Sequence, residues 1–267
     1  MNQPDEIRTQ TAPEPFRDPQ DERVSALARS ADRARHYARR PLARTPYLWD
    51  AAMRIRPEKR ATLARPDTAI VIEGFLRSGN TFSVAAFSIA NGPELHVGRH
   101  LHGAPHVLRS VRLGLPTVVL IRQPRDAVLS YLVRRPTLTP YDALVEYLDF
   151  YRTAWPARHG FVVAPFDQVT SDFGAVLAQV NERFGTSFRR YEPTPENEAR
   201  AFQLVEEMNR LETGGEVVES LVGRPSAERS RRKDELRALL DRPRTAALLR
   251  EAEDLFERYM DLAQERS

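Results

Sequence analysis

Cysteine is absent from this chain of 267 residues. Disulfide bridges and thiolate metal sites are therefore excluded. Lysine is also scarce, since Lys59 and Lys233 are the only two and arginine carries nearly all of the positive charge. The formal net charge is only +3, and acidic residues are interspersed with the basic ones. We therefore expect no nucleic-acid-binding surface.

Long apolar runs are missing as well. No run approaches the roughly 20 residues that span a bilayer, and the first residues lack the basic-then-apolar order of a signal peptide. We expect a cytoplasmic protein without a transmembrane segment. Hydrophobic residues make up 41% of the chain, which is enough for one substantial core.

The chain divides into three parts by composition. Residues 1–20 hold four prolines and many polar residues, which is typical of a disordered tail. Helical spacing of apolar residues follows, so we predict that residues 21–66 are a helical arm that packs on the core or on a partner. Residues 67–267 form the main domain, and the sequence does not reveal its oligomeric state.

Strand and helix patterns alternate through that domain and predict an α/β fold of three layers with a central parallel sheet. Beyond Pro195 the chain becomes helical. The predicted strands are 68–73, 95–99, 117–122 and 161–166, and the predicted helices between and after them are 80–90, 105–113, 124–134, 141–155 and 172–184.

A buried strand running into a glycine-bearing turn, Ile70–Phe82, is the most informative segment. Its two glycines have the spacing of the ATP-binding P-loop and Thr81 follows, but Asn80 occupies the lysine position. An amide supplies neither the charge nor the reach of that lysine. A cation stands inside the loop instead, as Arg77, beside the N–H groups of the turn and the positive end of the next helix. We predict that the loop binds the 5′ end of a nucleotide.

A second anion-binding pattern follows the strand at 117–122. Arg122 falls at the carboxyl end of that strand, which is the ligand-binding edge of an open α/β sheet. Pro124 starts a helix on which Ser130 lies further along. A guanidinium fork and a hydroxyl suit an isolated phosphate. Two such sites on one sheet indicate a nucleotide with two separated phosphates.

The paired motifs resemble those of sulfotransferases that use 3′-phosphoadenosine 5′-phosphosulfate (PAPS). The family's 5′-phosphosulfate loop, close to Pro-Lys-Ser-Gly-Thr-Thr-Trp, is matched by Leu76–Phe82, and its 3′-phosphate motif, close to Arg-Asn-Pro-Lys-Asp-Ala-Val-Ser-Ser-Tyr, is matched by Arg122–Tyr131. The resemblance covers residues 68–188. It implies a P-loop-like sulfotransferase fold, PAPS as cofactor, 3′,5′-bisphosphoadenosine (PAP) as product, and no metal.

The resemblance also implies roles for individual residues. Arg77 replaces the family's usual lysine, as in some bacterial members, and keeps the charge but gives up a proton less readily. Phe82 stands where a tryptophan often stacks on adenine, and Phe166-Asp167-Gln168 stands for a Tyr-Glu-Asp segment. The implied cofactor contacts are Arg77, Ser78, Gly79, Asn80, Thr81, Phe82, Arg122, Ser130 and, in a basic loop, Arg224.

Four of the six histidines lie between residues 96 and 106. Imidazole titrates near neutrality and suits removal of a hydroxyl proton. The family's base is often a histidine followed by leucine at a strand end, which His100 matches, while His102 competes for the role. We interpret His96 as a strand residue and His106 as a helix-start residue. A zinc site at His100 and His102 is the weaker interpretation, because this segment offers no Cys, Glu or Asp.

The sequence therefore predicts a PAPS-dependent sulfotransferase that transfers the sulfuryl group to a hydroxyl acceptor. Arg77 would stabilise the phosphosulfate and His100 would act as general base. The acceptor class stays open among small molecules, glycans and lipids. Two alternatives remain at this stage: a P-loop kinase that uses ATP and Mg²⁺, and a non-catalytic nucleotide-binding scaffold.

Overall fold

The computed structural model describes residues 34, 37, 45–213 and 236–265. The predicted tail at 1–20, nearly all of the arm before residue 45, and Arg224 lie outside these residues. The described part holds one sheet of parallel strands in the order β2-β1-β3-β4. The predicted α/β fold with a central parallel sheet is thus confirmed. The strands are β1 (Ile70–Gly74), β2 (Val97–Arg99), β3 (Thr117–Ile121) and β4 (Val162–Pro165).

The helices agree with the predicted ones to within one residue, apart from an unpredicted short helix after β4. Asp172 separates that helix from the next one, and its side chain accepts a hydrogen bond from the amide of Ala175. The helices are α3 (Pro46–Ile55), α4 (Pro57–Arg60), α5 (Asn80–Asn91), α6 (Ala104–Arg112), α7 (Pro124–Arg134), α8 (Pro140–Ala154), the 3₁₀ helix η1 (Trp155–Gly160), α9 (Phe166–Ser171), α10 (Phe173–Phe184), α11 (Pro195–Thr213) and α13 (Pro243–Gln264).

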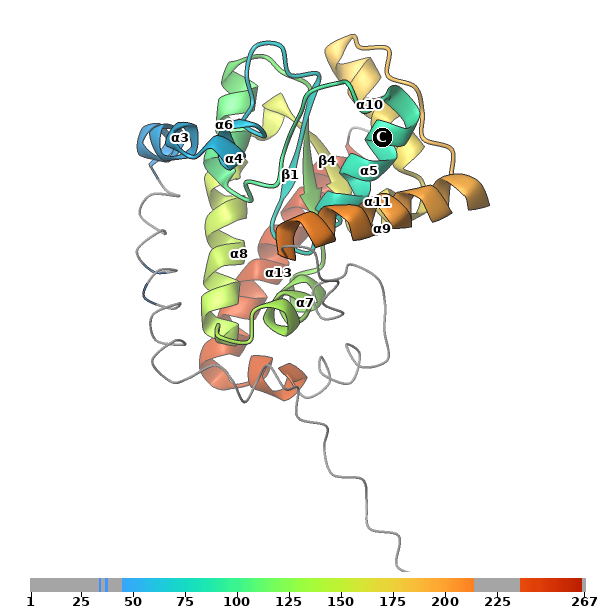
Figure 1. The fold of residues 1–267 in the computed structure, drawn as a ribbon. Coiled ribbons are helices and arrows are strands. Elements are labelled where there is room, and N and C mark those ends of the chain that lie inside the picture. Colours follow the sequence, from blue (N-terminus) through green and yellow to red (C-terminus); the bar gives the residue numbers. More distant parts are fainter. Residues whose placement is uncertain (1–33, 35–36, 38–44, 214–235, 266–267) are drawn as a thin grey trace, which may run out of the picture.

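Alternate residues of the strands face two separate cores, which makes the fold three-layered. Val119 and Ile121 pack with α6, α7, α8 and α13, whereas Val118 and Leu120 pack with α5, α9 and α10. Figure 1 shows α13 running beside α8, and α11 crossing over α5. Burial on both faces accounts for the apolar residues of β1, β3 and β4, whereas the short β2 ends in the half-buried Arg99.

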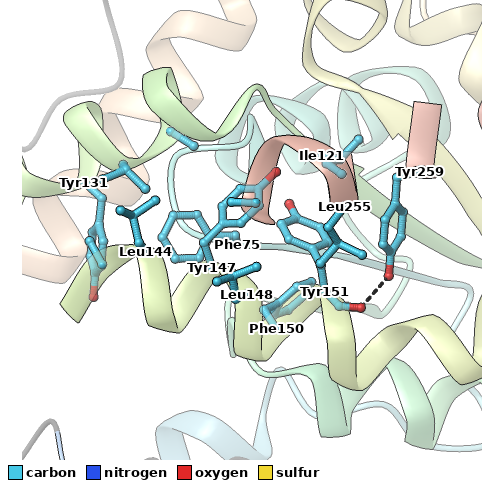
Figure 2. Packing of buried hydrophobic residues seen from close by; sticks show 14 of the residues in the cluster. Phe75, Ile121, Tyr131, Leu144, Tyr147, Leu148, Phe150, Tyr151, Leu255 and Tyr259 are labelled. Carbon is cyan, nitrogen blue, oxygen red and sulfur yellow. Dashed lines mark hydrogen bonds between the residues drawn. The ribbon is translucent and has the colours of Figure 1, made fainter. Parts of the chain in front are cut away.

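An aromatic cluster joins α8 and α13 to the sheet (Figure 2). The hydroxyl of Tyr259 donates to the carbonyl of Tyr151 at 2.8 Å, and the hydroxyl of Tyr151 donates to the carbonyl of Leu120 at 2.8 Å. Phe75, at the start of the loop after β1, packs edge-on against Tyr147 at 5.2 Å between ring centroids. The start of the loop therefore packs on a cluster of buried aromatic side chains.

The described end of the arm packs on the core. Trp49 of α3 is 5% exposed, and its ring lies 5.9 Å from the ring of His106. Gly103 makes this approach possible, since a Cβ there would lie 2.9 Å from the indole Nε1 of Trp49. Among the helices described, none has the length and apolarity needed to cross a bilayer.

Candidate active site

The two motifs predicted to bind phosphate groups flank the point where the sheet's connections diverge. The chain leaves β1 toward β2 on one side, and leaves β3 toward β4 on the other. Ligands of open α/β sheets bind at this switch point, outside the carboxyl ends of the strands. The loop Phe75–Gly79 follows β1 and Arg122 follows β3, so both motifs meet at this point.

The loop after β1 is a tight turn closed by its own side chains. The carbonyl of Phe75 accepts from the amide of Ser78 at 3.3 Å and from Nδ2 of Asn80 at 3.0 Å. Gly79 has a φ of 94°, and Arg77 a φ of 71°, in the left-handed region. Asn80, which occupies the P-loop lysine position, is 4% exposed and closes the turn. It cannot reach outward as the lysine of a P-loop does.

Three of the predicted site residues come into direct contact. Nε of Arg77 donates to the hydroxyl of Ser130 at 3.1 Å. Nη1 of Arg122 donates to the carbonyl of Arg77, also at 3.1 Å. The arginine inside the first loop is therefore linked to both polar residues of the second motif.

The other residues predicted to contact the cofactor at this loop differ in how far their side chains are exposed. Ser78 is fully buried, and its hydroxyl lies 3.5 Å from that of Tyr151, so its side chain faces the core. Thr81 is half-buried in the first turn of α5. Phe82 is half-buried too, and packs edge-on against Tyr191 with ring centroids 6.1 Å apart. The N-terminal turn of α5 thus offers backbone N–H groups rather than the hydroxyl of Ser78.

Arg122 is held from several sides. Its guanidinium stacks on the ring of Phe166 at 3.9 Å, and its carbonyl accepts from the hydroxyl of Tyr147 at 2.9 Å. Burial lowers the pKa of Arg122, and the nearby carboxylates of Asp126 and Asp167 oppose that shift. The guanidinium stays charged at neutral pH. Arg122 is a preorganised cation at the switch point.

Two tyrosines one turn apart on α8 pack against the segments after β1 and β3, and the sequence analysis did not identify them. The hydroxyl of Tyr147 donates to the carbonyl of Arg122. The hydroxyl of Tyr151 donates to the carbonyl of Leu120 and lies near the hydroxyl of Ser78. Burial raises the pKa of both phenols, so both stay protonated and can donate. Their spacing in the helix was the signal available in the sequence.

The histidine segment follows directly on β2. His100 and His102 have φ values of 57° and 48°, and their rings stack at 5.9 Å with an interplanar angle of 19°. Nδ1 of His102 lies 3.2 Å from the carbonyl of Gly74, at the end of β1. Both rings therefore share one side, although the strand has already ended at Arg99.

The other two histidines have structural partners. His96, directly before β2, contacts the hydroxyl of Thr68 at 2.8 Å and the carbonyl of Ala61 at 3.0 Å. His106, in the first turn of α6, is buried. His106 thus lies at a helix start as interpreted, whereas His96 lies just outside the strand in which it was predicted.

Glu73, which the sequence analysis did not identify, lies at the centre of the histidine segment. Its carboxylate is fully buried and accepts from the amides of Leu101 at 2.9 Å and His102 at 3.1 Å, and from Nδ1 of His106 at 2.9 Å. Burial raises the pKa of Glu73, but the hydrogen bond from His106, with smaller contributions from attraction to His102 and from the Leu101 amide, brings it below its ordinary value. Glu73 is an ionised carboxylate inside the fold.

Two observations concern other kinds of site. Within residues 45–213 and 236–265, no three His, Asp or Glu side chains gather as metal ligands would. A cavity of about 640 Å³ lies at the amino-terminal edge of β3 and β4, lined in part by Leu115, Val162 and Phe184. None of the predicted site residues lines it, so it is separate from the switch point.

Comparison with known proteins adds little. Neither the protein-family models nor the curated proteins contain a match. Among solved structures, the chain is similar to mouse sulfotransferase SULT7A1 complexed with PAP, with 14% sequence identity over 71% of this chain and 89% of that one, and a TM-score of 0.36. This overlap is too loose to carry an argument, so the functional conclusion rests on the residues of this chain.

Proposed function

We propose that the protein is a PAPS-dependent sulfotransferase that transfers the sulfuryl group to a hydroxyl acceptor. The observation that carries the proposal is the convergence of two arginine motifs at the switch point. Arg77 contacts Ser130, and Arg122 contacts the backbone of Arg77. A nucleotide with a phosphate at each end of its ribose needs such a pair of cationic sites, whereas a 5′-triphosphate needs one extended cradle.

The remaining roles follow from the chemistry of the transfer. The acceptor's hydroxyl oxygen attacks sulfur, and the bond from sulfur to the bridging phosphate oxygen breaks. Arg77 and the N-terminus of α5 face the charge that develops on that oxygen. Arg122 and Ser130 bind the 3′-phosphate, Phe82 packs on adenine, and PAP leaves.

The acceptor's proton goes to a histidine, and the hydrogen bond of His102 favours this residue over His100. A carbonyl only accepts, so Nδ1 of His102 carries the proton that points to Gly74. In the neutral ring Nε2 then keeps its lone pair and can act as the base. His100, which the sequence favoured, stacks beside it.

A ligand-binding experiment tests the proposal against both alternatives. PAP should raise the melting temperature, and at about 100 times its dissociation constant it should add roughly 2.7 kcal/mol, or several degrees for a chain of this size. ATP with Mg²⁺ should add none. Stabilisation by ATP alone would favour the kinase. Binding of PAP without turnover of labelled PAPS across phenols, sugars and hydroxylated lipids would favour the scaffold.

A further inference from the structure

Glu73 is the one charged side chain of β1, and it is fully buried at the penultimate position of that strand. An ionised carboxylate is strongly disfavoured inside a protein unless hydrogen bonds replace the lost water. Three N–H donors do so here: the amides of Leu101 and His102, from the segment between β2 and α6, and Nδ1 of His106, from the first turn of α6. The carboxylate therefore ties the end of β1 to the histidine segment.

The segment that Glu73 holds has an unfavourable backbone. His100 and His102 both have φ values in the left-handed region, where non-glycine residues are rare and carry strain. The amides of Leu101 and His102 bind different oxygens of the carboxylate. This fork fixes the direction of two successive peptide units. The carboxylate thus supports a conformation that the two histidines would not adopt by themselves.

The ring of His102 is oriented by the same strand. Its Nδ1 lies 3.2 Å from the carbonyl of Gly74 and 4.0 Å from Oε2 of Glu73. The second distance is too long for a hydrogen bond but short enough for attraction between opposite charges, although the His102 side chain is 25% exposed and water screens part of that attraction. A positive charge gained by His102 would therefore be stabilised from the Nδ1 side, while Nε2 takes up the proton.

His106 also binds the Glu73 carboxylate, and Trp49 packs beside His106. His106 donates from Nδ1 to Glu73, and its Nε2 accepts from the amide of Ala64 at 2.8 Å, so the ring is neutral. Trp49 packs on Gly103 and lies 5.9 Å from the ring of His106. With His106 neutral, the charge of Glu73 is available to His102.

We propose that Glu73 is the positioning residue of this site: its carboxylate fixes the segment from His100 to His102 and attracts the charge that His102 gains when it takes the acceptor's proton. The proposal rests on the proposed function, in which His102 is the base. It adds a residue that touches neither nucleotide nor acceptor.

The test compares Glu73→Gln with Thr117→Val. Glutamine keeps the size of the side chain but removes its charge and turns an NH₂ group toward the amide donors. Thr117 is also buried, and its hydroxyl lies 2.8 Å from the carbonyl of Leu115 and 2.9 Å from the hydroxyl of Ser110, but it lies at the opposite end of the sheet. Thr117→Val should leave every readout unchanged. Glu73→Gln should keep PAP affinity within about twofold and lower kcat by up to about 10²-fold, the loss expected for a small misplacement of the base.

The pH dependence separates positioning from general damage. Loss of the carboxylate should shift the acid limb of the kcat/KM profile to lower pH, because His102 then loses its attracting charge. Glu73→Asp keeps the charge with a shorter reach, so it should lower kcat while the acid limb stays near the wild-type position. An equal loss of kcat at every pH in Glu73→Gln, with the limb unmoved, would show a merely structural role and overturn the proposal.

A measurement without turnover keeps this inference apart from the proposed function. The ring nitrogens of His102, assigned by comparison with His102→Ala, can be titrated by NMR in the wild-type protein and in Glu73→Gln. The proposal expects an Nδ1–H tautomer and a titration midpoint that falls in the variant. An unchanged midpoint overturns it even if PAPS is turned over, whereas failure to bind PAP would reject the sulfotransferase and leave the coupling of Glu73 and His102 standing.

Discussion

Nε of Arg77 and the hydroxyl of Ser130 lie 3.1 Å apart, although 53 positions separate them in the chain. The sequence motifs assign these residues to opposite ends of a nucleotide. Their contact joins the loop after β1 to the helix after β3, and it lies mostly inside the fold because Ser130 is 3% exposed. Arg122 strengthens the junction, since it donates to the carbonyl of Arg77.

Arg122→Ala should weaken PAP binding far more than binding of adenosine 5′-phosphosulfate, which lacks the 3′-phosphate. A charge-assisted contact contributes roughly 1.5–3 kcal/mol, so the affinity for PAP should fall by about 10- to 150-fold. Isothermal titration calorimetry with both ligands measures this. Arg125→Ala is the matched control, because Arg125 lies in the first turn of α7, shortly after Arg122, and pairs with Asp241 at 2.9 Å. Equal weakening of both ligands would mean that Arg122 acts only by supporting the loop through Arg77.

Tyr151→Phe should destabilise the fold and also disturb nucleotide binding. The change removes the hydroxyl that donates to Leu120 and lies beside Ser78, at a cost of about 1–3 kcal/mol in the free energy of unfolding. Tyr259→Phe removes a hydrogen bond of the same length, to the carbonyl of Tyr151, but further from the loop. Urea unfolding should report similar losses for the two variants. PAP affinity should fall only in Tyr151→Phe, and a fall in both would contradict a specific role under the loop.

The sequence was sufficient to predict the strands and the longer helices in chain order, because apolar runs and helical spacing reflect burial. The short helix α9 was missed, whereas the helix predicted at 172–184 begins one residue later, after Asp172 caps it. A helix of 6 residues in which only Val169 is buried has too short an apolar pattern to be predicted.

Within the site, motif spacing identified the two arginines but not the residues whose hydrogen bonds position the site. Arg77, Arg122 and Ser130 come together at the carboxyl edge of the sheet, and their role in binding a nucleotide stays a prediction. Glu73 was missed because its partners lie 28 to 33 positions later in the chain, and such pairing has no local pattern. Ser78 shows the converse. It belongs to the motif, yet its hydroxyl faces the core, since the direction of a side chain in a tight turn depends on the packing beneath it.

Acid should weaken the fold through Glu73. Its pKa in the folded protein lies below the ordinary value of 4.5, so the unfolded chain binds a proton at higher pH than the folded one. The stabilisation is fully present above about pH 4.5 and is lost as the pH falls through the folded pKa. Urea unfolding between pH 7 and pH 3 should show the wild-type protein losing its advantage over Glu73→Gln as the solution is acidified. A constant difference across that range would mean that folding does not lower the pKa of the Glu73 carboxyl.

His102→Ala should lower turnover by about 10²–10⁴-fold, the usual contribution of a general base. It should leave PAP affinity unchanged, because the ring is expected to contact the acceptor and not the nucleotide. His100→Ala should have a much smaller effect. His96→Ala serves as the control for loss of an imidazole, since both ring nitrogens of His96 form hydrogen bonds, one with the hydroxyl of Thr68 and one with the carbonyl of Ala61. Circular dichroism and PAP binding establish that each variant is folded, and labelled PAPS with an accepted hydroxyl compound gives the rates. If His100→Ala abolishes turnover while His102→Ala keeps it, the base is the residue that the sequence favoured, and the hydrogen bond from His102 to Gly74 only anchors the segment. If neither substitution lowers turnover, the proton leaves through a group outside the histidine segment.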